Sequence, residues 1–215
     1  MRLFLSVKLF ECIEQCKVMF RYYRSWKFTL LDITFLSLYF WSNPYRIARK
    51  YYQKKGAKNI HCYGETPLTT LSTIADALQL KPSDVILELG CGRARSCFWL
   101  SYFTNCHVIG VEQIQRFTIP AEYLRRWFQI PNLTVVCDDY LHLDFSDISV
   151  IYLYGSDLSD DRIERLIEKM KSMRKHSRVL SISYPLESEI FQVEKTFPVR
   201  FNWGETTAYM QRKIL

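Results

Sequence analysis

The sequence lacks paired cysteines. Its 7 cysteines are an odd number and none belongs to a Cys-x-x-Cys motif, which argues against a disulfide framework. Cys91 and Cys137 fall within or beside predicted strands, so we expect reduced thiols in a cytoplasmic protein. Histidine is also scarce, and His61, Cys62 and His142 offer no second close ligand pair for zinc. We therefore predict no metal site.

The sequence also lacks a hydrophobic run long enough to cross a membrane. The longest apolar segment, residues 28–41, contains Asp32 and is shorter than the roughly 20 residues that a spanning helix needs. Lys8 and Glu11 interrupt the apolar start of the chain and no small-residue cleavage site follows, so we expect no signal peptide. Segment 28–41 is instead predicted to be a helix that docks on the domain or lies in a membrane interface.

No internal repeat or low-complexity segment appears, and 215 residues at 48% hydrophobic suffice for one domain and an extension. The net charge of +7 is uneven: residues 1–60 hold 12 Lys and Arg against 3 Asp and Glu, and the remainder holds 17 against 19. We predict a basic, aromatic helical extension at 1–60 and one domain at 61–215. The extension would contact a membrane surface, an acidic protein or nucleic acid, or present a solvated helix face.

Short apolar runs and helical patterns follow each other along residues 61–215. The runs predicted to form strands are 85–87, 108–111, 133–136, 148–153 and 179–182. Helical patterns include 68–80, 121–128 and 160–173. Two last runs, 199–203 and 207–213, have no helix between them and suit a closing hairpin. The alternation predicts an α/β fold with a Rossmann-like, mostly parallel sheet.

Residues 84–95 form the most informative segment. Residues 85–87 suit a buried strand, and Gly90 and Gly92 let the following backbone turn tightly and approach a ligand. Twenty residues after Gly92, the next apolar run ends in Glu112, a carboxylate suited to ribose hydroxyls. The segment predicts a nucleotide-cofactor loop that includes Cys91, and the alternative is a purely structural turn.

A dinucleotide fingerprint requires a third glycine where this chain has Arg95. Glu88, two positions before Gly90, is instead similar to the pattern of class I S-adenosylmethionine-dependent methyltransferases. That resemblance implies a seven-stranded sheet with an antiparallel last strand. It also implies S-adenosyl-L-methionine as the cofactor, with Glu88, Gly90 and Gly92 on its methionine side.

Polar residues before and after these strands would complete the cofactor site. Asp139 can accept from the adenine amine and Tyr140 can stack on the ring, although Asp138 and Asp139 also suit a turn or a helix cap. Ahead of the first strand, a helix N-terminus near residues 63–70 can hold the methionine carboxylate. The alternative there is that Thr66 simply caps the helix.

Four elements together carry a closer resemblance. They are Tyr-Gly-Glu-Thr at 63–66, Glu-Leu-Gly-Cys-Gly at 88–92, Gly-Val-Glu at 110–112 and Ile-Pro-Ala-Glu-Tyr at 119–123. From about residue 62 to its end, the chain resembles the non-SET histone lysine methyltransferases of the disruptor-of-telomeric-silencing type. The resemblance implies that the cofactor is held by the matching residues Tyr63, Thr66, Glu88, Gly90, Glu112, Asp139 and Tyr140.

One departure concerns the segment after the fourth predicted strand. The histone-modifying family has paired asparagines where this chain has Tyr154 and Gly155. Residues 150–158 are instead similar to small membrane-associated lysine methyltransferases that modify ATP synthase c-subunits and nucleotide carriers. Those enzymes also have a Gly-x-Gly-x-x-Arg loop, which Arg95 matches, and a hydrophobic N-terminal extension. Both resemblances imply that the partner is a protein substrate with a lysine acceptor.

Transfer to lysine needs a neutral amine aligned with the methyl group in a site that excludes water. Aromatic walls serve that purpose and can hold the ammonium product. We expect Tyr63, Tyr154 and Tyr184 to be wall residues, with Glu65 or Asp157 orienting the amine. Because the chain has 14 tyrosines, simple packing is the alternative for each ring.

Three other functions stay open. Nucleic-acid methyltransferases that modify amino groups carry Asn/Asp-Pro-Pro-Tyr after the fourth strand, and this chain lacks that motif. A small-molecule acceptor leaves no sequence signature. The fold could also serve as a non-catalytic membrane or nucleic-acid binding module, but the intact Glu88, Gly90, Gly92 and Glu112 favour an enzyme.

Overall fold

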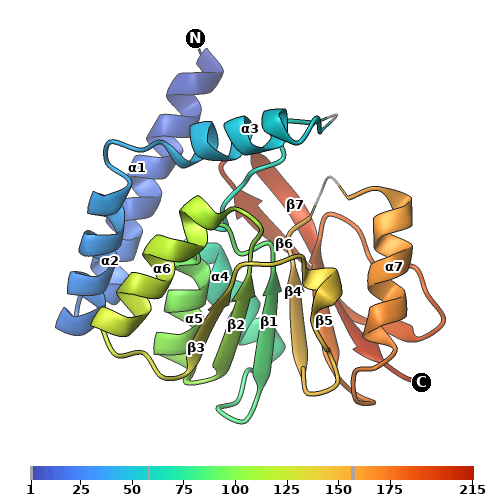
Figure 1. The fold of residues 1–215 in the computed structure, drawn as a ribbon. Coiled ribbons are helices and arrows are strands. Elements are labelled where there is room, and N and C mark those ends of the chain that lie inside the picture. Colours follow the sequence, from blue (N-terminus) through green and yellow to red (C-terminus); the bar gives the residue numbers. More distant parts are fainter. Residues whose placement is uncertain (1, 58, 156–157) are drawn as a thin grey trace.

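The computed structural model describes residues 2–57, 59–155 and 158–215, with side chains from residue 7 onward. Seven strands form one sheet in the order β3-β2-β1-β4-β5-β7-β6 (Figure 1). Their bounds are β1 Val85–Leu89, β2 His107–Val111, β3 Leu133–Val136, β4 Val150–Leu153, β5 Arg178–Ile182, β6 Phe191–Phe201 and β7 Gly204–Lys213. The predicted α/β fold is confirmed.

The direction of the strands also agrees with the prediction. Strands β1 to β5 pair in parallel, and β7 runs antiparallel to both β5 and β6. The predicted closing hairpin is therefore present. Its first strand begins at Phe191, well before the predicted 199. The sequence pattern did not predict this earlier start, because residues 192–196 are exposed and carry no apolar run.

Helices cover both faces of the sheet. They are α4 Leu68–Leu78, α5 Arg95–Thr104, α6 Gln115–Trp127 and α7 Asp160–Met170, with a short 3₁₀ helix, η1, at Tyr140–His142. Side chains alternate between faces along a strand, so Ile86 of β1 packs with α4, α5 and α6 while Leu87 packs with α7 and η1. Helix α6 begins before Pro120, which lies inside it and masks the first half of the helix in the sequence pattern.

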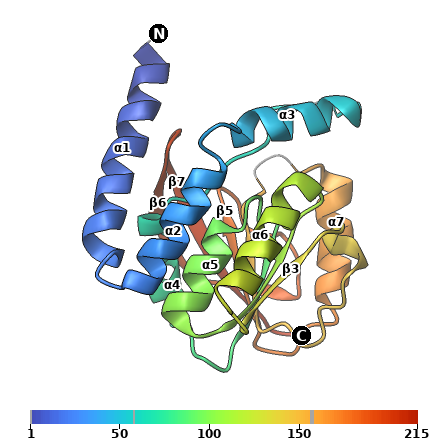
Figure 2. The same cartoon turned by 60° about the vertical axis from the view of Figure 1, so that its left-hand side comes forward.

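The N-terminal extension packs onto the face of the sheet that α4, α5 and α6 cover. It forms α1 Arg2–Tyr22, α2 Trp26–Leu38 and α3 Pro44–Lys54, and Figure 2 shows α2 lying over α5 and α6. Val18, Phe28 and Phe35 are fully buried in the same hydrophobic cluster as Phe98 of α5. The predicted helices of residues 1–60 are thus part of a core that continues into residues 61–215.

Several large side chains of the extension remain outside this core. Trp26, Phe40 and Trp41 are 70%, 76% and 91% exposed. No helix in the described parts of the chain combines the length and the apolar character needed to cross a membrane. Contact of the extension with a membrane interface stays a prediction, and these rings are the ones that would enter it.

Candidate functional site

A cavity of about 630 Å³ lies where β1 and β4 end. In Figure 1 this is the upper edge of the sheet, beneath α3. Five residues that the sequence predicts for the site line the cavity: Tyr63, Gly90, Glu112, Tyr140 and Tyr154. At the carboxyl ends of parallel strands, such a crevice is the usual ligand site of an open α/β sheet.

The loop after β1 takes the tight turn that its glycines predict. Gly90 and Gly92 have φ angles of +73° and +54°, and the N–H groups of Gly90 and Cys91 donate to the Val111 carbonyl at 2.9 and 3.0 Å. A Cβ on Gly92 would lie 3.0 Å from the Tyr63 ring. Both the turn and the close approach of Tyr63 therefore require glycine.

Glu112 lines the cavity and accepts a hydrogen bond from the loop after β1. Its carboxylate accepts the N–H groups of Gly92 at 3.0 Å and Ile114 at 2.8 Å, one on each oxygen, and the residue is only 8% exposed. Burial raises the pKa of Glu112, and the hydrogen bonds from Ile114 and Gly92 oppose that rise. Because each carboxylate oxygen has two lone pairs, both retain capacity for a ligand hydroxyl.

The carboxylates after β3 are arranged differently from the prediction. Asp138 lines the cavity, whereas Asp139 is absent from the lining. Asp139 accepts from Arg162 at 2.6 Å and from the Leu141 N–H at 3.0 Å, so it caps η1, as the alternative interpretation of the sequence has it. Tyr140 lies on the cavity wall as predicted, and the Arg162 guanidinium lies 4.6 Å from its ring centre.

Tyr63 and Glu65 belong to one network with Arg93, in which Arg93 is buried and the other two side chains are half-buried. Arg93 donates to both oxygens of Glu65 at 2.6 and 2.5 Å, and the Tyr63 hydroxyl donates to the same carboxylate. Burial alone would raise the pKa of Glu65, but the Arg93 guanidinium and these hydrogen bonds lower it. Glu65 holds the Tyr63 ring at the cavity and, with its oxygens so engaged, is poorly placed to orient a substrate amine.

An aromatic stack leads out of the cavity from Tyr154. Its ring stacks on Phe201 with 4.7 Å between centroids, Phe201 stacks on Trp203 at 5.5 Å, and the Trp203 indole N–H donates to the Tyr154 hydroxyl at 2.7 Å. Tyr184, which is absent from the cavity lining, donates its hydroxyl to the Gly155 carbonyl. Asp157, the other predicted amine-orienting group, lies outside the described residues.

Six predicted cofactor residues are absent from the cavity lining: Thr66, Glu88, Cys91, Gly92, Arg95 and Asp139. Glu88 accepts hydrogen bonds from Ser96 at 2.5 Å and Cys97 at 3.1 Å, beneath the loop. Thr66 bonds the Tyr152 hydroxyl at 2.5 Å instead of capping α4. Arg95 forms an ion pair with Asp32 of α2. Arg95 therefore ties the loop to the extension, whereas Glu88 and Thr66 bond partners within residues 61–215. Direct contact with a cofactor stays a prediction for all three.

The burial of Glu88 should make the stability of the folded protein depend on pH. Burial raises its pKa to about 7, although the hydrogen bonds from Ser96 and Cys97 oppose the rise. The contribution of such a carboxyl to stability is fully present when the pH is below the unfolded pKa of about 4.5. It is lost as the pH rises through the folded pKa of about 7. Glu88→Gln should therefore be more stable than the wild type by about 3 kcal/mol at pH 8 and by less than about 1 kcal/mol at pH 5.

Urea unfolding at both pH values measures this difference, with Glu187→Gln as the control because Glu187 is exposed. An equal effect of Glu88→Gln at pH 5 and pH 8 would contradict a raised pKa in the folded protein.

Sequence reasoning missed the contribution of the extension to the cavity. Tyr51 and Lys55, at the end of α3, line it together with Gln113, which accepts from the Tyr51 hydroxyl at 3.3 Å. Other lining residues that were not predicted are Tyr52, Ala57, Asn59, Cys62, Gly64, Leu89, Val111, Asp138, Leu153, Gly155, Leu158, Ser159 and Arg162. The alternation of aromatic and basic residues at 49–55 was the available signal, but it does not specify which surface α3 covers.

No cluster of three or more His, Cys, Asp or Glu side chains that could hold a metal ion occurs among the described residues. No cysteine in that part of the chain forms a disulfide, and Cys91 of the loop is buried.

Solved structures provide the comparison with known proteins. An RNA methyltransferase from Salinibacter ruber, in complex with S-adenosyl-L-homocysteine, matches with a TM-score of 0.59 at 16% identity, covering 69% of this chain and 93% of that one. The chain has the class I methyltransferase fold. The B. subtilis M1A22 tRNA methyltransferase TrmK matches at 0.55 and 13% identity, covering 67% of this chain and 66% of TrmK.

Another neighbour shows that this fold serves other chemistry. The [4+2]-cyclase SpnF matches with a TM-score of 0.56 at 11% identity, covering 67% of this chain and 80% of that one. No protein-family model and no curated protein matches the sequence. The fold alone therefore does not specify the function.

Proposed function

We propose that this chain is an S-adenosyl-L-methionine-dependent methyltransferase. The observation that carries the proposal is the cavity at the carboxyl ends of β1 and β4, which brings the Gly90 turn and the Glu112 carboxylate to one wall. Its volume of about 630 Å³ suits a cofactor-sized ligand. The complex of the S. ruber neighbour with S-adenosyl-L-homocysteine supports the same choice of ligand.

The lining residues fit the parts of this cofactor. Glu112 would accept the ribose hydroxyls, and Tyr140 would pack on the adenine, with Asp138 in place of Asp139 as the acceptor for the adenine amine. The open backbone at Gly90 and the Tyr63 ring would border the methionine portion. When bound, the sulfonium supplies an activated methyl group, so the protein needs to align the acceptor and exclude water.

A protein lysine is one candidate acceptor. Tyr63 and Tyr154, which the sequence predicts as walls, both line the cavity, and burial raises the pKa of both hydroxyls, so the two rings stay neutral. Neutral aromatic walls suit a lysine side chain and its methylated product. Glu65 is already paired with Arg93, so we assign no base that would deprotonate the lysine amine.

A nucleic acid is the second candidate, and the aromatic stack favours it. Trp203 is 51% exposed and continues the stack that starts at Tyr154 in the cavity, so a nucleobase can pack on it. Two of the matched structures are, by description, an RNA and a tRNA methyltransferase. The missing Asn/Asp-Pro-Pro-Tyr motif argues only against the amino-methylating enzymes that use it.

Transfer of radiolabelled methyl from S-adenosyl-L-methionine tests the proposal. The acceptors are histones, nucleosomes, membrane extract and RNA, each supplied separately, and Glu112→Ala is the control enzyme. Label recovered as methyl-lysine supports the first acceptor, and label in RNA supports the second. Absence of both cofactor binding and label would contradict the proposed function.

A further inference from the structure

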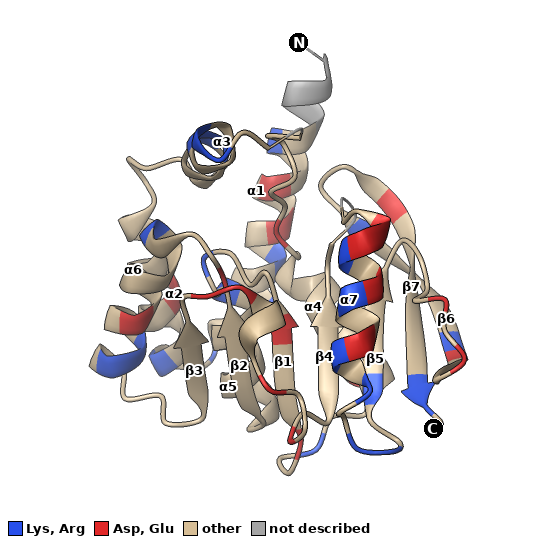
Figure 3. Ribbon diagram, turned by 45° about the vertical axis from the view of Figure 1, so that its right-hand side comes forward, with Lys and Arg blue, Asp and Glu red and all other residues tan. Residues whose placement is uncertain are grey.

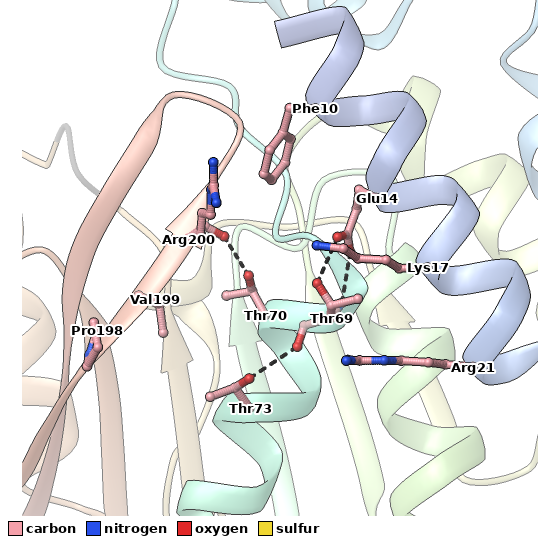
Figure 4. Close-up of a pocket in the computed structure, with 10 residues that line it drawn as sticks. All are labelled: Phe10, Glu14, Lys17, Arg21, Thr69, Thr70, Thr73, Pro198, Val199 and Arg200. Atoms are coloured by element: carbon pink, nitrogen blue, oxygen red, sulfur yellow. Dashed lines mark hydrogen bonds between the residues drawn. The ribbon is translucent and has the colours of Figure 1, made fainter. Parts of the chain in front are cut away.

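A second hollow lies between α1, α4 and the end of β6, and Figure 4 shows its lining. Its volume is about 280 Å³, and three cationic side chains border it: Lys17 and Arg21 from α1 and Arg200 from β6. Thr69 and Thr73 of α4 add hydroxyl groups. We call these five residues the basic groove. None of them lines the large cavity, so the groove is a separate site.

The cations of the basic groove have no carboxylate partner. Across the described residues, no ion pair includes Lys17, Arg21 or Arg200. Glu14 also lines the hollow, but its two oxygens accept the Thr69 N–H at 2.9 Å and the Thr69 hydroxyl at 2.8 Å. Three cations against this one carboxylate leave an excess of positive charge in the groove. Arginine and lysine side chains exposed in this way are suited to phosphate oxygens.

A second group of cations lies on α3. Helix α3 carries Arg46, Arg49, Lys50 and Lys54 and no acidic residue, as the blue band in Figure 3 shows. These cations also take part in no ion pair with another described residue. Two such groups of unpaired cations suit a chain of phosphates better than a single ion.

The β6–β7 hairpin connects the groove to the cavity. Arg200 borders the groove, its neighbour Phe201 packs on Tyr154 of the cavity, and Trp203 at the turn bonds the Tyr154 hydroxyl. A strand whose phosphates lie against Arg200 would thus pass over the exposed Trp203 ring toward the cavity. Stacking of a base on that ring and pairing of phosphates with cations are the two contacts by which proteins hold single-stranded nucleic acids.

We infer that the basic groove binds the phosphate backbone of a nucleic acid acceptor. This inference rests on the proposed methyltransferase function and narrows its acceptor to nucleic acid. The groove would hold phosphates on one side of the hairpin while a nucleotide reaches the cavity on the other side. The side chains involved touch neither the Gly90 turn nor Glu112, so the groove contributes to acceptor binding and leaves cofactor binding unchanged.

The test compares Arg21→Gln/Arg200→Gln with the wild type in binding a fluorescent 20-nucleotide RNA of mixed sequence. Each phosphate contact contributes about 0.7 to the slope of log affinity against log salt for a single strand. The double variant should therefore lose about 1.4 from that slope and bind RNA at least about tenfold more weakly at low salt. Affinity for S-adenosyl-L-homocysteine, measured by calorimetry, should not change.

The matched control is Arg174→Gln/Lys175→Gln. It removes two exposed cations from the turn before β5, at the opposite end of the sheet. The control should retain the RNA affinity and salt slope of the wild type. An unchanged slope in the groove variant would overturn the inference, as would an equal loss in both variants, which would indicate a general charge effect.

Two further probes separate this inference from the proposed function. Inorganic phosphate or an acidic peptide that competes with RNA at equal charge concentration would overturn a nucleic acid site. If the groove variant loses RNA binding but the wild type binds no cofactor, the groove stands and the proposed function fails. If the wild type binds cofactor and methylates lysine, with no loss in the groove variant, the inference fails and the function stands.

Discussion

Asp32→Ala should destabilise the protein by about 3 kcal/mol, because it removes one partner of a buried ion pair. The side chain of Asp32 is 2% exposed and accepts from Arg95 at 2.8 and 2.7 Å and from Tyr23 at 2.9 Å. Among the described residues, the variant leaves the Arg95 guanidinium, at the interface of α2 and α5, with a hydrogen bond to Gln15 alone. For a chain of this size the loss corresponds to roughly 6–12 °C in Tm, measured by thermal unfolding.

Asp147→Ala is the matched control for that result. Asp147 also pairs with an arginine, Arg174, but both side chains are exposed, at 80% and 76%. Removing such a pair changes stability by less than about 1 kcal/mol. Similar Tm values for the two variants would mean that the extension is only loosely held on the domain.

Glu112→Ala should weaken the binding of S-adenosyl-L-homocysteine by about 1–3 kcal/mol, or roughly 5- to 150-fold. The loss has two physical sources, because the carboxylate both positions the Gly92 and Ile114 N–H groups and offers acceptors to the ribose. Calorimetric titration measures the affinity. Glu168→Ala, which removes an exposed carboxylate of α7, is the control.

A ligand series separates those two sources. Methylthioadenosine and its 2′-deoxy analogue differ by one ribose hydroxyl. If Glu112 accepts that hydroxyl, the wild type should discriminate between the two ligands and Glu112→Ala should bind them about equally. Discrimination that persists in the variant would show that another group contacts the ribose, and unchanged affinity for both would mean that the loop is assigned wrongly.

The sheet could be predicted from the sequence because its central strands are buried on both faces. Residues 85–87 and 150–153 are continuous apolar runs, and such runs identify parallel strands without any knowledge of their neighbours. The beginning of β6 could not be predicted, because residues 192–196 are exposed on an edge strand and show no apolar pattern. The start of α6 was also not predicted, because Pro120 lies inside the helix and a proline usually marks a helix boundary in a sequence.

The predicted positions of the loop residues depend on local backbone conformation. Gly90 and Gly92 take positive φ angles, and Glu112 follows β2 directly, so these positions depend on local sequence. Glu88, Arg95 and Asp139 matched the expected pattern equally well, yet their side chains bond Ser96, Asp32 and Arg162. A charged side chain at an interior position bonds whichever partner the packing brings within reach, and sequence spacing does not specify that partner.

The sequence by itself determined the order of strands and helices, the turn after β1 and the carboxylate after β2, because each depends on residues within one short segment. Only the tertiary structure decided that α3 covers the cavity, that Tyr154, Phe201 and Trp203 form one stack, and that Lys17, Arg21 and Arg200 share a groove. These arrangements join residues more than 40 positions apart, and their contacts form only when helices and strands pack on a common core.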